Sequence, residues 1–212
     1  HVIVGETLSI RLYQALSAAL QMQPERRIIL SDQGNFPSDM YIANGLISRL
    51  NLGHELRVVK SDKLVDNISD QVAVLLLTEV DYKTSRKHDL AELTKIARSK
   101  GVITVWDLAH SAGAIEVSLG KCKVDFAVGC TYKYLNGGPG APAFIYISPK
   151  HANKIEPILS GWLGHIEPFS FSNNYVPANG VDRMQVGTPP IISMVALEAA
   201  LEMWTSIDIK DV

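Results

Sequence analysis

Two residues of opposite charge follow apolar segments that have the character of buried strands. Asp107 comes directly after residues 102–106, and Lys133 lies three positions beyond residues 126–130. An isolated aspartate is most often a helix cap, and an isolated lysine is most often solvated. If both segments are neighbouring strands of one parallel sheet, however, the carboxylate and the amine lie at the same edge.

A third feature bears on the chemistry of this pair. Gly5 follows the apolar residues 2–4 and leads into a helical pattern, and a glycine turn before a helix leaves backbone N–H groups free to bind an anion. Pyridoxal phosphate (PLP) needs a lysine that forms a Schiff base, an acid beside its pyridine nitrogen and a site for its phosphate. The sequence therefore offers one candidate for each part of a PLP site.

Apolar strand patterns and helical patterns alternate along the chain, and both kinds of element are needed to place these residues. Strands are expected at residues 2–4, 28–30, 56–59, 72–77, 102–106, 126–130 and 144–147, and helices at residues 8–20, 40–50 (ending at Gly53), 90–97 and from Pro189 and Pro190 onward. This alternation predicts an α/β fold with a mostly parallel sheet flanked by helices. Ligands of such sheets bind beyond the carboxyl ends of the strands, where Asp107 and Lys133 are expected.

The composition excludes several other classes of protein. The 212 residues are 47% hydrophobic and 20% charged, so the chain can bury a sizeable core. A net charge of −2 gives no basic surface for nucleic acid or an anionic membrane, and no apolar stretch reaches the roughly 18 residues of a membrane span. Cys122 and Cys130 are the two cysteines, which fits a reducing compartment and packing roles.

Motifs of competing chemistries are absent from the sequence. There is no GxGxxG, no P-loop motif and no GxSxG elbow, and the metal-binding patterns CxxC and HExxH do not occur either. Asp107 and His110 could ligate a metal, but no third ligand follows at suitable spacing, so no metal is expected.

Two longer segments resemble the kynureninase family of fold-type-I PLP enzymes. They are WDLAHSAGA at residues 106–114 and DFAVGCTYKYLNGGPG at residues 125–140, and shorter matches occur at residues 34–39, 161–165 and 187–190. The resemblance covers essentially the whole chain. It implies the large domain of a fold-type-I PLP-dependent transferase-like enzyme, in agreement with the predicted α/β sheet.

The resemblance also implies a set of site residues. Lys133 matches the Schiff-base lysine, Asp107 matches the acid at the pyridinium nitrogen, and Tyr132 matches a phosphate ligand that is also a candidate proton donor. The further cofactor contacts that it implies are Leu8 and Ser9 at the phosphate-binding helix start, the stacking ring Phe36 with Pro37, Ser38 and Asp39, and Thr78, His110, Trp162 and Thr188.

Simpler roles remain open for four of these residues. Phe36 and Trp162 could be core residues, His110 could be a structural hydrogen-bonding group, and Thr188 could cap the final helix. In the family, an asparagine at the position of Thr188 accompanies a preference for the hydroxylated substrate, so threonine favours kynurenine.

The implied reaction is hydrolysis of L-kynurenine, or of 3-hydroxykynurenine, to anthranilate or 3-hydroxyanthranilate and L-alanine, a step of tryptophan catabolism. The resemblance further implies a cytoplasmic homodimer that acts on a small amino acid. Two alternatives remain: another fold-type-I PLP enzyme, such as a cysteine desulfurase or an aminotransferase, and a domain that folds but turns nothing over. A desulfurase needs a mobile cysteine late in the chain, and neither cysteine is placed for that role.

Members of the family are considerably longer than 212 residues, with an earlier N-terminal segment and a C-terminal small domain. We therefore expect residues 1–212 to be the PLP-binding large domain without those two parts. The arginine that binds the substrate carboxylate belongs to the C-terminal part in the family, and no residue of this chain matches it. We expect residues 1–212 alone to be catalytically silent.

Overall fold

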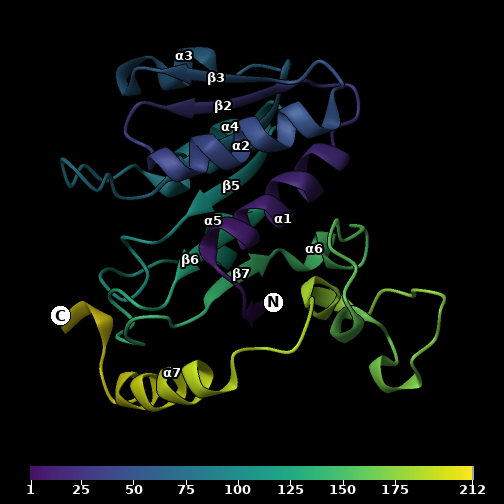
Figure 1. Cartoon of the computed structure of the whole chain (residues 1–212). Helices are drawn as coiled ribbons and strands as arrows, with labels where there is room; N and C mark the ends of the chain where they lie inside the picture. The colour runs from purple at the N-terminus through teal and green to yellow at the C-terminus, as the bar shows by residue number, and fades with distance from the viewer. Residues whose placement is uncertain (212) are drawn as a thin grey trace.

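The computed structural model describes residues 1–211, in which one seven-stranded sheet lies between layers of helices (Figure 1). The strands are β1 (Val2–Val4), β2 (Ile28–Asp32), β3 (Glu55–Val59), β4 (Val72–Thr78), β5 (Ile103–Asp107), β6 (Phe126–Cys130) and β7 (Ala143–Ile147). The α-helices are α1 (Leu8–Gln21), α2 (Pro37–Leu50), α3 (Leu64–Asn67), α4 (Leu90–Ser99), α5 (Leu119–Cys122), α6 (Pro149–Ala152) and α7 (Ile191–Trp204). Five 3-10 helices complete the described elements: η1 (Ser61–Lys63), η2 (Trp162–Gly164), η3 (Pro168–Ser170), η4 (Gly180–Met184) and η5 (Ile209–Asp211).

The strand order is β1-β7-β6-β5-β4-β2-β3, and the five strands from β6 to β3 are parallel. Only β7 runs the other way, because it pairs antiparallel with both β6 and β1. This mixed but mostly parallel sheet confirms the predicted fold class. The carboxyl ends of β1, β2, β4, β5 and β6 therefore share one edge of the sheet.

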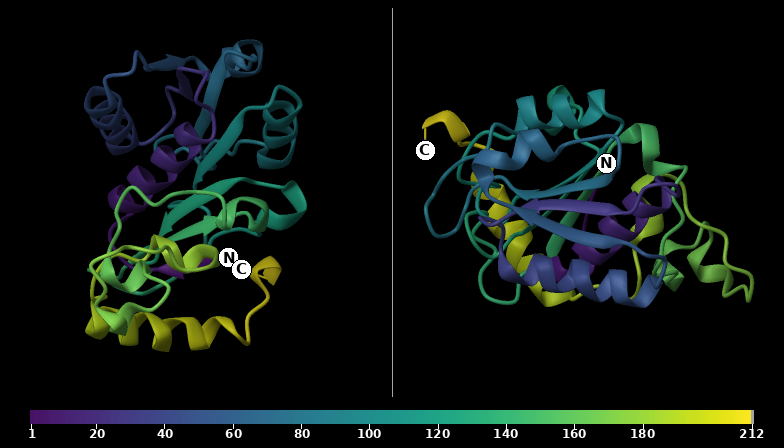
Figure 2. Two further views of the ribbon diagram at one scale, coloured as in Figure 1. Left: turned by 90° about the vertical axis from the view of Figure 1, so that its right-hand side faces the viewer. Right: turned by 90° about the horizontal axis from the view of Figure 1, so that it is seen from above.

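The central strands are buried on both faces, which is why their sequences are continuously apolar rather than alternating. Alternate residues of β4 point to opposite helix layers. Val74 and Leu76 join one core cluster with α1 and α2, whereas Leu75 and Leu77 join a second cluster with α4. Figure 2 shows these helices on the two sides of the sheet in its right-hand view.

The expected helices are present, but some of their ends differ from the prediction. α2 begins at Pro37 and ends at Leu50, and its C-cap residue Asn51 adopts the left-handed conformation (φ 50°) and donates its N–H to the Ile47 carbonyl. The prediction that Gly53 ends this helix was therefore wrong. An asparagine tolerates the left-handed region better than most residues, which makes it an effective substitute for glycine at this position.

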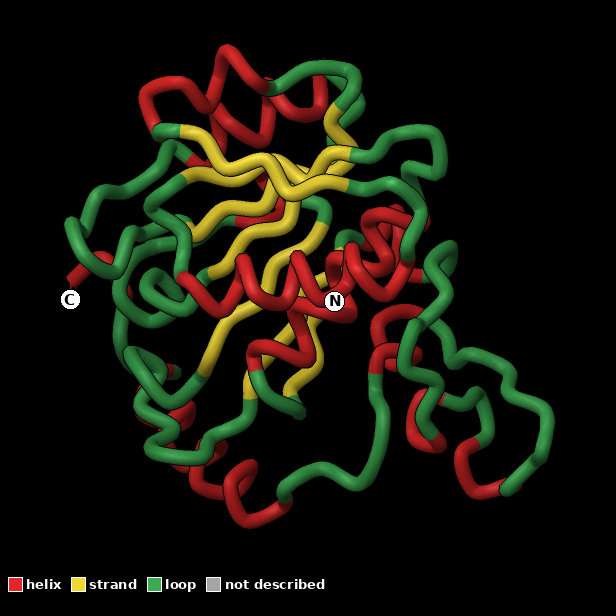
Figure 3. Tube along the Cα trace, turned by 45° about the horizontal axis from the view of Figure 1, so that its top comes forward, coloured by secondary structure: helices red, strands yellow, loops and turns green. Residues whose placement is uncertain are grey.

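The last third of the chain leaves the sheet. Residues 153–190 form a loop-rich segment with three 3-10 helices, and α7 then crosses the molecule away from the central strands (Figure 3). Only Leu197 and Ala200 of α7 are fully buried. Among the described residues, none of the helices has the length and hydropathy needed to cross a membrane.

Candidate active site

Three neighbouring strands deliver predicted site residues to the same edge of the sheet. Thr78 ends β4 and Asp107 ends β5, and the two residues are paired in the register of these strands. β6 ends at Cys130, after which Thr131 and the exposed Tyr132 lead to Lys133. The geometry thus brings Thr78, Asp107 and Lys133 together as the sequence predicts.

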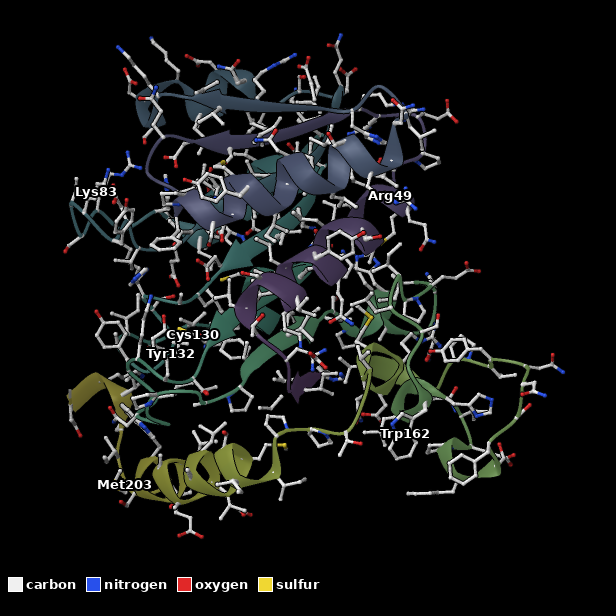
Figure 4. The ribbon with its side chains drawn as sticks, in the orientation of Figure 1. Arg49, Lys83, Cys130, Tyr132, Trp162 and Met203 are labelled. Carbon is white, nitrogen blue, oxygen red and sulfur yellow. The ribbon has the colours of Figure 1, made fainter. Side chains whose placement is uncertain are left out.

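The amine of Lys133 lies among polar and aromatic groups. Its Nζ is 2.8 Å from His110 Nε2, 5.8 Å from the centre of the Phe36 ring and 5.6 Å from the centre of the Tyr132 ring. Burial and the nearby Lys133 charge both lower the pKa of His110. A neutral His110 can accept a hydrogen bond from the lysine amine. Tyr132 projects from the loop after β6, beside Cys130 (Figure 4).

Two buried carboxyl groups lie near this amine. Asp107 is 1% exposed and accepts a hydrogen bond from the Ala109 N–H at 2.9 Å. Asp39, in the first turn of α2, is completely buried, and neither of its oxygens has a hydrogen-bond partner among residues 1–211. Unpartnered buried carboxylate oxygens are rare, because each costs its desolvation energy without compensation.

The electrostatics of the two carboxyl groups follow from this arrangement. Burial raises the pKa of Asp107, although the Ala109 N–H and the Lys133 charge act in the opposite direction. Burial also raises the pKa of Asp39, and the charge of Asp107 raises it further, while Lys133 lowers it. A cationic N–H group placed beside them would stabilise both in their charged forms.

Phe36 takes part in an aromatic group that includes a residue the sequence analysis missed. Tyr82 packs edge-on against Phe36 with ring centres 5.0 Å apart, and its ring stacks on His110 at 6.3 Å. Phe36 and His110 are 6.4 Å apart. Tyr82 lies in the loop after β4, four residues beyond Thr78. The rule that selects residues after strand ends could have found it.

The start of α1 lies at the same edge of the sheet. β1 pairs with β7, and the Gly5 N–H donates to the carbonyl of Ala143, the residue that pairs with Cys130. Thr7 caps the helix by accepting the Ile10 N–H. Leu8 and Ser9, both half-buried, therefore begin a helix whose free N–H groups can bind a phosphate close to the loop after β6.

Three further predicted residues, Pro37, Ser38 and Thr78, lie beside the buried carboxyl groups in sequence or in the sheet. Pro37 and Ser38 form the first turn of α2 together with Asp39. The Thr78 hydroxyl lies 3.3 Å from the Val80 carbonyl and 3.5 Å from that of Asp107, at the limit of a hydrogen bond. These residues keep the backbone around the carboxyl groups in place.

Two predicted site residues come from the last third of the chain, outside the sheet. Trp162 begins η2, is 40% exposed and packs edge-on against Phe169. It lies on the opposite side of the lower half of the molecule from Tyr132 (Figure 4). Thr188 is exposed in the segment before α7, and the cap position of that helix is Pro190, so Thr188 is not its N-cap. The described chain therefore keeps Trp162 apart from Tyr132.

The two cysteines differ in their surroundings. Cys130 is buried at the end of β6, with its thiol 3.8 Å from the Ala109 carbonyl, and burial raises its pKa. Cys122 is half-buried at the end of α5, and burial raises its pKa as well. Both thiols are therefore poor nucleophiles at neutral pH, as expected of packing residues.

Comparison with known proteins assigns the chain and its fold to a class. The model of the family described as aminotransferase class-V matches residues 12–212. The chain belongs to the aminotransferase class-V family. A solved cysteine desulfurase from Thermococcus onnurineus superposes with a TM-score of 0.79 at 25% identity, over 99% of this chain and 53% of that one.

Two curated relatives have a higher sequence identity to this chain than the solved structure does. It is 49% identical over 208 residues to a kynureninase from Deinococcus radiodurans, which covers 98% of this chain and 50% of the relative. It is 45% identical over 212 residues to a kynureninase from Pseudomonas fluorescens, covering 98% of this chain and 51% of the relative. The chain thus spans about half the length of the curated relatives it matches.

Proposed function

We propose that the protein catalyses the PLP-dependent hydrolysis of L-kynurenine, or of its 3-hydroxy form, to anthranilate or 3-hydroxyanthranilate and L-alanine. The observation that carries the proposal is the position of Lys133, whose amine lies 2.8 Å from His110 Nε2 and close enough to the buried carboxyl groups of Asp39 and Asp107 for its charge to lower the pKa of both. The 49% identity to a kynureninase supports the choice of substrate.

The residues present fit PLP. Both oxygens of Asp39 and the Nδ1 atom of His110 are buried without a hydrogen-bond partner in the described chain. A protonated pyridine nitrogen supplies the cation that two buried carboxyl groups of raised pKa require. Phe36 offers a flat apolar face for the ring, and Ser9 with the N-terminus of α1 offers donors for the phosphate.

Each residue then has a chemical role in the proposed reaction. When bound, PLP supplies an electron sink for the bonds that break at the substrate's α- and β-carbons. Lys133 holds the cofactor, and its amine accepts the α-proton as a general base. Asp107 would stabilise a positive charge on the pyridine nitrogen. Tyr132, half exposed beside Lys133, would bind the phosphate and supply the proton that completes L-alanine.

We infer that the active protein is a homodimer. Trp162 lies on the opposite side of the lower half of the chain from Tyr132, so a second copy is needed if both are to contact the same cofactor. α7 supports this inference, because Ile191, Ile192 and Val195 are 57%, 88% and 58% exposed. Exposed apolar surface of this kind is typical of protein interfaces.

We further propose that residues 1–212 are the PLP-binding large domain of a cytoplasmic enzyme. The matched relatives are about twice as long, and their remaining length leaves room for the groups that bind the substrate carboxylate. Both cysteines are free thiols, one half-buried and one buried, which supports a reducing compartment.

The test is a kynurenine assay on the full-length protein loaded with PLP. Production of fluorescent anthranilate together with equimolar L-alanine supports the proposal. Release of sulfide from L-cysteine without cleavage of kynurenine would identify a desulfurase instead. Binding of PLP without turnover of either substrate would indicate a protein that folds and binds the cofactor but catalyses neither reaction.

A further inference from the structure

Asp32, the last residue of β2, is the centre of a polar cluster that the proposed chemistry does not use. Its Oδ2 accepts hydrogen bonds from Ser61 Oγ at 2.5 Å and Arg86 Nη2 at 2.7 Å, and it lies 3.1 Å from His88 Nε2. Oδ1 accepts the Gly34 N–H at 3.1 Å. We name the side chains of Asp32, Ser61, Arg86 and His88 the loop latch.

The loop latch holds a charged carboxylate in the interior. The side chain of Asp32 is completely buried, and burial by itself raises the pKa of a carboxyl group. Hydrogen bonds from His88, Ser61 and Arg86 outweigh this effect, so the pKa of Asp32 falls well below its ordinary value. Loss of the charge would weaken the hydrogen bonds from its partners, and the contacts between their segments would weaken with them.

The loop latch joins three segments that follow three different strands. Asp32 ends β2 and begins the segment that follows it, Ser61 belongs to η1 after β3, and Arg86 and His88 belong to the loop after β4. The loop after β4 also has hydrogen bonds of its own, because the carboxylate of Asp81 accepts from the Lys83 N–H and from the Thr84 hydroxyl. A change at Asp32 therefore acts mainly on the packing of the loop after β2 against the loop after β4.

Gly34 shows how closely these two loops approach each other. A Cβ atom at Gly34 would lie 3.0 Å from Asp81 Oδ2 and 3.1 Å from Arg86 Nη2. Both distances are shorter than ordinary carbon contacts with polar atoms. The absence of a side chain at Gly34 therefore allows the loop after β2 to pack against the loop after β4.

Each of these loops carries one ring of the candidate site. Phe36 lies four residues after Asp32, and Tyr82 lies four residues before Arg86. Their rings meet edge to face at 5.0 Å, and both contact the ring of His110, the partner of Lys133. The loop latch thus fixes the relative position of two aromatic rings beside the lysine amine.

We propose that Asp32 is a positioning residue, which through the loop latch holds Phe36 and Tyr82 in the arrangement that binds the cofactor ring. It does not touch the reacting atoms. The identity of the cofactor rests on the proposed function, but the effect of Asp32 on the two loops does not.

The test compares Asp32→Asn with wild type in the full-length protein. We expect the Kd for PLP to rise about tenfold, because displaced Phe36 and Tyr82 rings would lose their contacts with the cofactor ring. In the protein without PLP, we expect faster amide hydrogen exchange at residues 33–38 and 79–88. The matched control is Asp125→Asn, which alters another buried, hydrogen-bonded aspartate and should leave both measurements within twofold of wild type.

An unchanged PLP affinity and unchanged exchange in Asp32→Asn would overturn the proposal, as would an equal effect of Asp125→Asn on PLP binding. If Asp32→Asn does not fold, Arg86→Gln replaces it, because the Arg86 side chain is 41% exposed and its loss is more easily tolerated. A folded Arg86→Gln protein should bind PLP about threefold more weakly, and unchanged binding would overturn the proposal. Failure of the wild type to bind PLP would contradict the proposed function, whereas the exchange measurement would still decide the role of Asp32.

Discussion

Asp125 at the amino edge of the sheet and Asp39 at its carboxyl edge are both almost completely buried, but their surroundings differ. Asp125 accepts hydrogen bonds from the Thr104 N–H at 3.0 Å and the Thr104 hydroxyl at 3.1 Å, and it pairs with Lys150 at 2.7 Å and His151 at 2.8 Å. Asp39 has no hydrogen-bond partner in the described chain.

The two environments shift the carboxyl groups in opposite directions. Burial would raise the pKa of Asp125, but hydrogen bonds from His151, Lys150 and Thr104 lower it overall. Burial and the neighbouring Asp107 raise the pKa of Asp39. Asp125 therefore contributes to the stability of the fold by itself. Asp39 reduces the stability of the protein without cofactor, as expected of a group whose partner is a ligand.

Replacing the lysine at the carboxyl edge should have the largest effect. Lys133→Ala should abolish covalent attachment of PLP and all turnover, because it removes the amine that lies 2.8 Å from His110 Nε2. Borohydride reduction of the PLP-loaded protein, followed by peptide mapping, identifies the modified lysine. Lys150→Ala is the control at the amino edge and should keep the label on Lys133. A label on another lysine would refute the assignment.

Removing the charge at Asp107 should affect the reaction more than the fold. Asp107→Asn should lower kcat in the full-length protein by 100- to 1,000-fold, or about 3–4 kcal/mol, because the pyridine nitrogen loses its anionic partner as negative charge develops. The thermal midpoint without PLP should not fall, since the pKa of Asp107 is raised by burial. Turnover close to wild type would show that Asp107 has a structural role, as the acceptor for the Ala109 N–H, and no role in the reaction.

Asp125→Asn should show the opposite pattern. We expect the free energy of unfolding at pH 7 to fall by about 2 kcal/mol, because hydrogen bonds to a buried charge are lost. The folded-state pKa of Asp125 lies below its ordinary value of 3.8, so this contribution is present above about pH 4 and is lost as the pH falls through the folded pKa. The difference between variant and wild type in denaturant titrations should therefore shrink in acid. A difference that persists unchanged in acid would contradict the assignment.

Asp39→Asn should stabilise the protein that lacks PLP. The folded-state pKa of Asp39 lies above 3.8, so the folded state binds the proton more tightly and stability falls as the pH rises above about 4. The variant removes this loss, and its free energy of unfolding at pH 8 should exceed that of wild type by about 1 kcal/mol or more. Denaturant titrations at pH 4 and pH 8 measure the difference. A variant less stable than wild type at pH 8 would show that Asp39 is satisfied within the fold.

The smallest effect is expected at Thr188, in the exposed segment before α7. Thr188→Asn should change the ratio of kcat/KM for 3-hydroxykynurenine over kynurenine by about threefold in favour of the hydroxylated substrate, because an amide can hydrogen-bond the extra hydroxyl. Kinetics of the full-length dimer with both substrates measure this ratio. An unchanged ratio would place Thr188 outside the substrate site.

Several features could be predicted from the sequence because they depend on local pattern. Continuous apolar runs predicted the buried strands, and the position of Asp107 and Lys133 after two such runs predicted their meeting at one edge. The polarity of a parallel sheet fixes that outcome, whatever the details of packing. The start of α1 beside this edge follows from the same rule, because β1 runs in the same direction as β6.

Only the tertiary structure decided which distant side chains meet. Asp32 pairs with Arg86 and His88, which are 54 and 56 residues away, and Tyr82 reaches Phe36 and His110 from a loop of no special composition. The burial of Asp39 without a partner in the described chain and the separation of Trp162 from Tyr132 likewise depend on how whole loops pack. Such contacts are set by strand register and loop geometry across the sheet. The pattern of residue types along the chain does not predict them, because it describes neighbours in sequence and not neighbours in space.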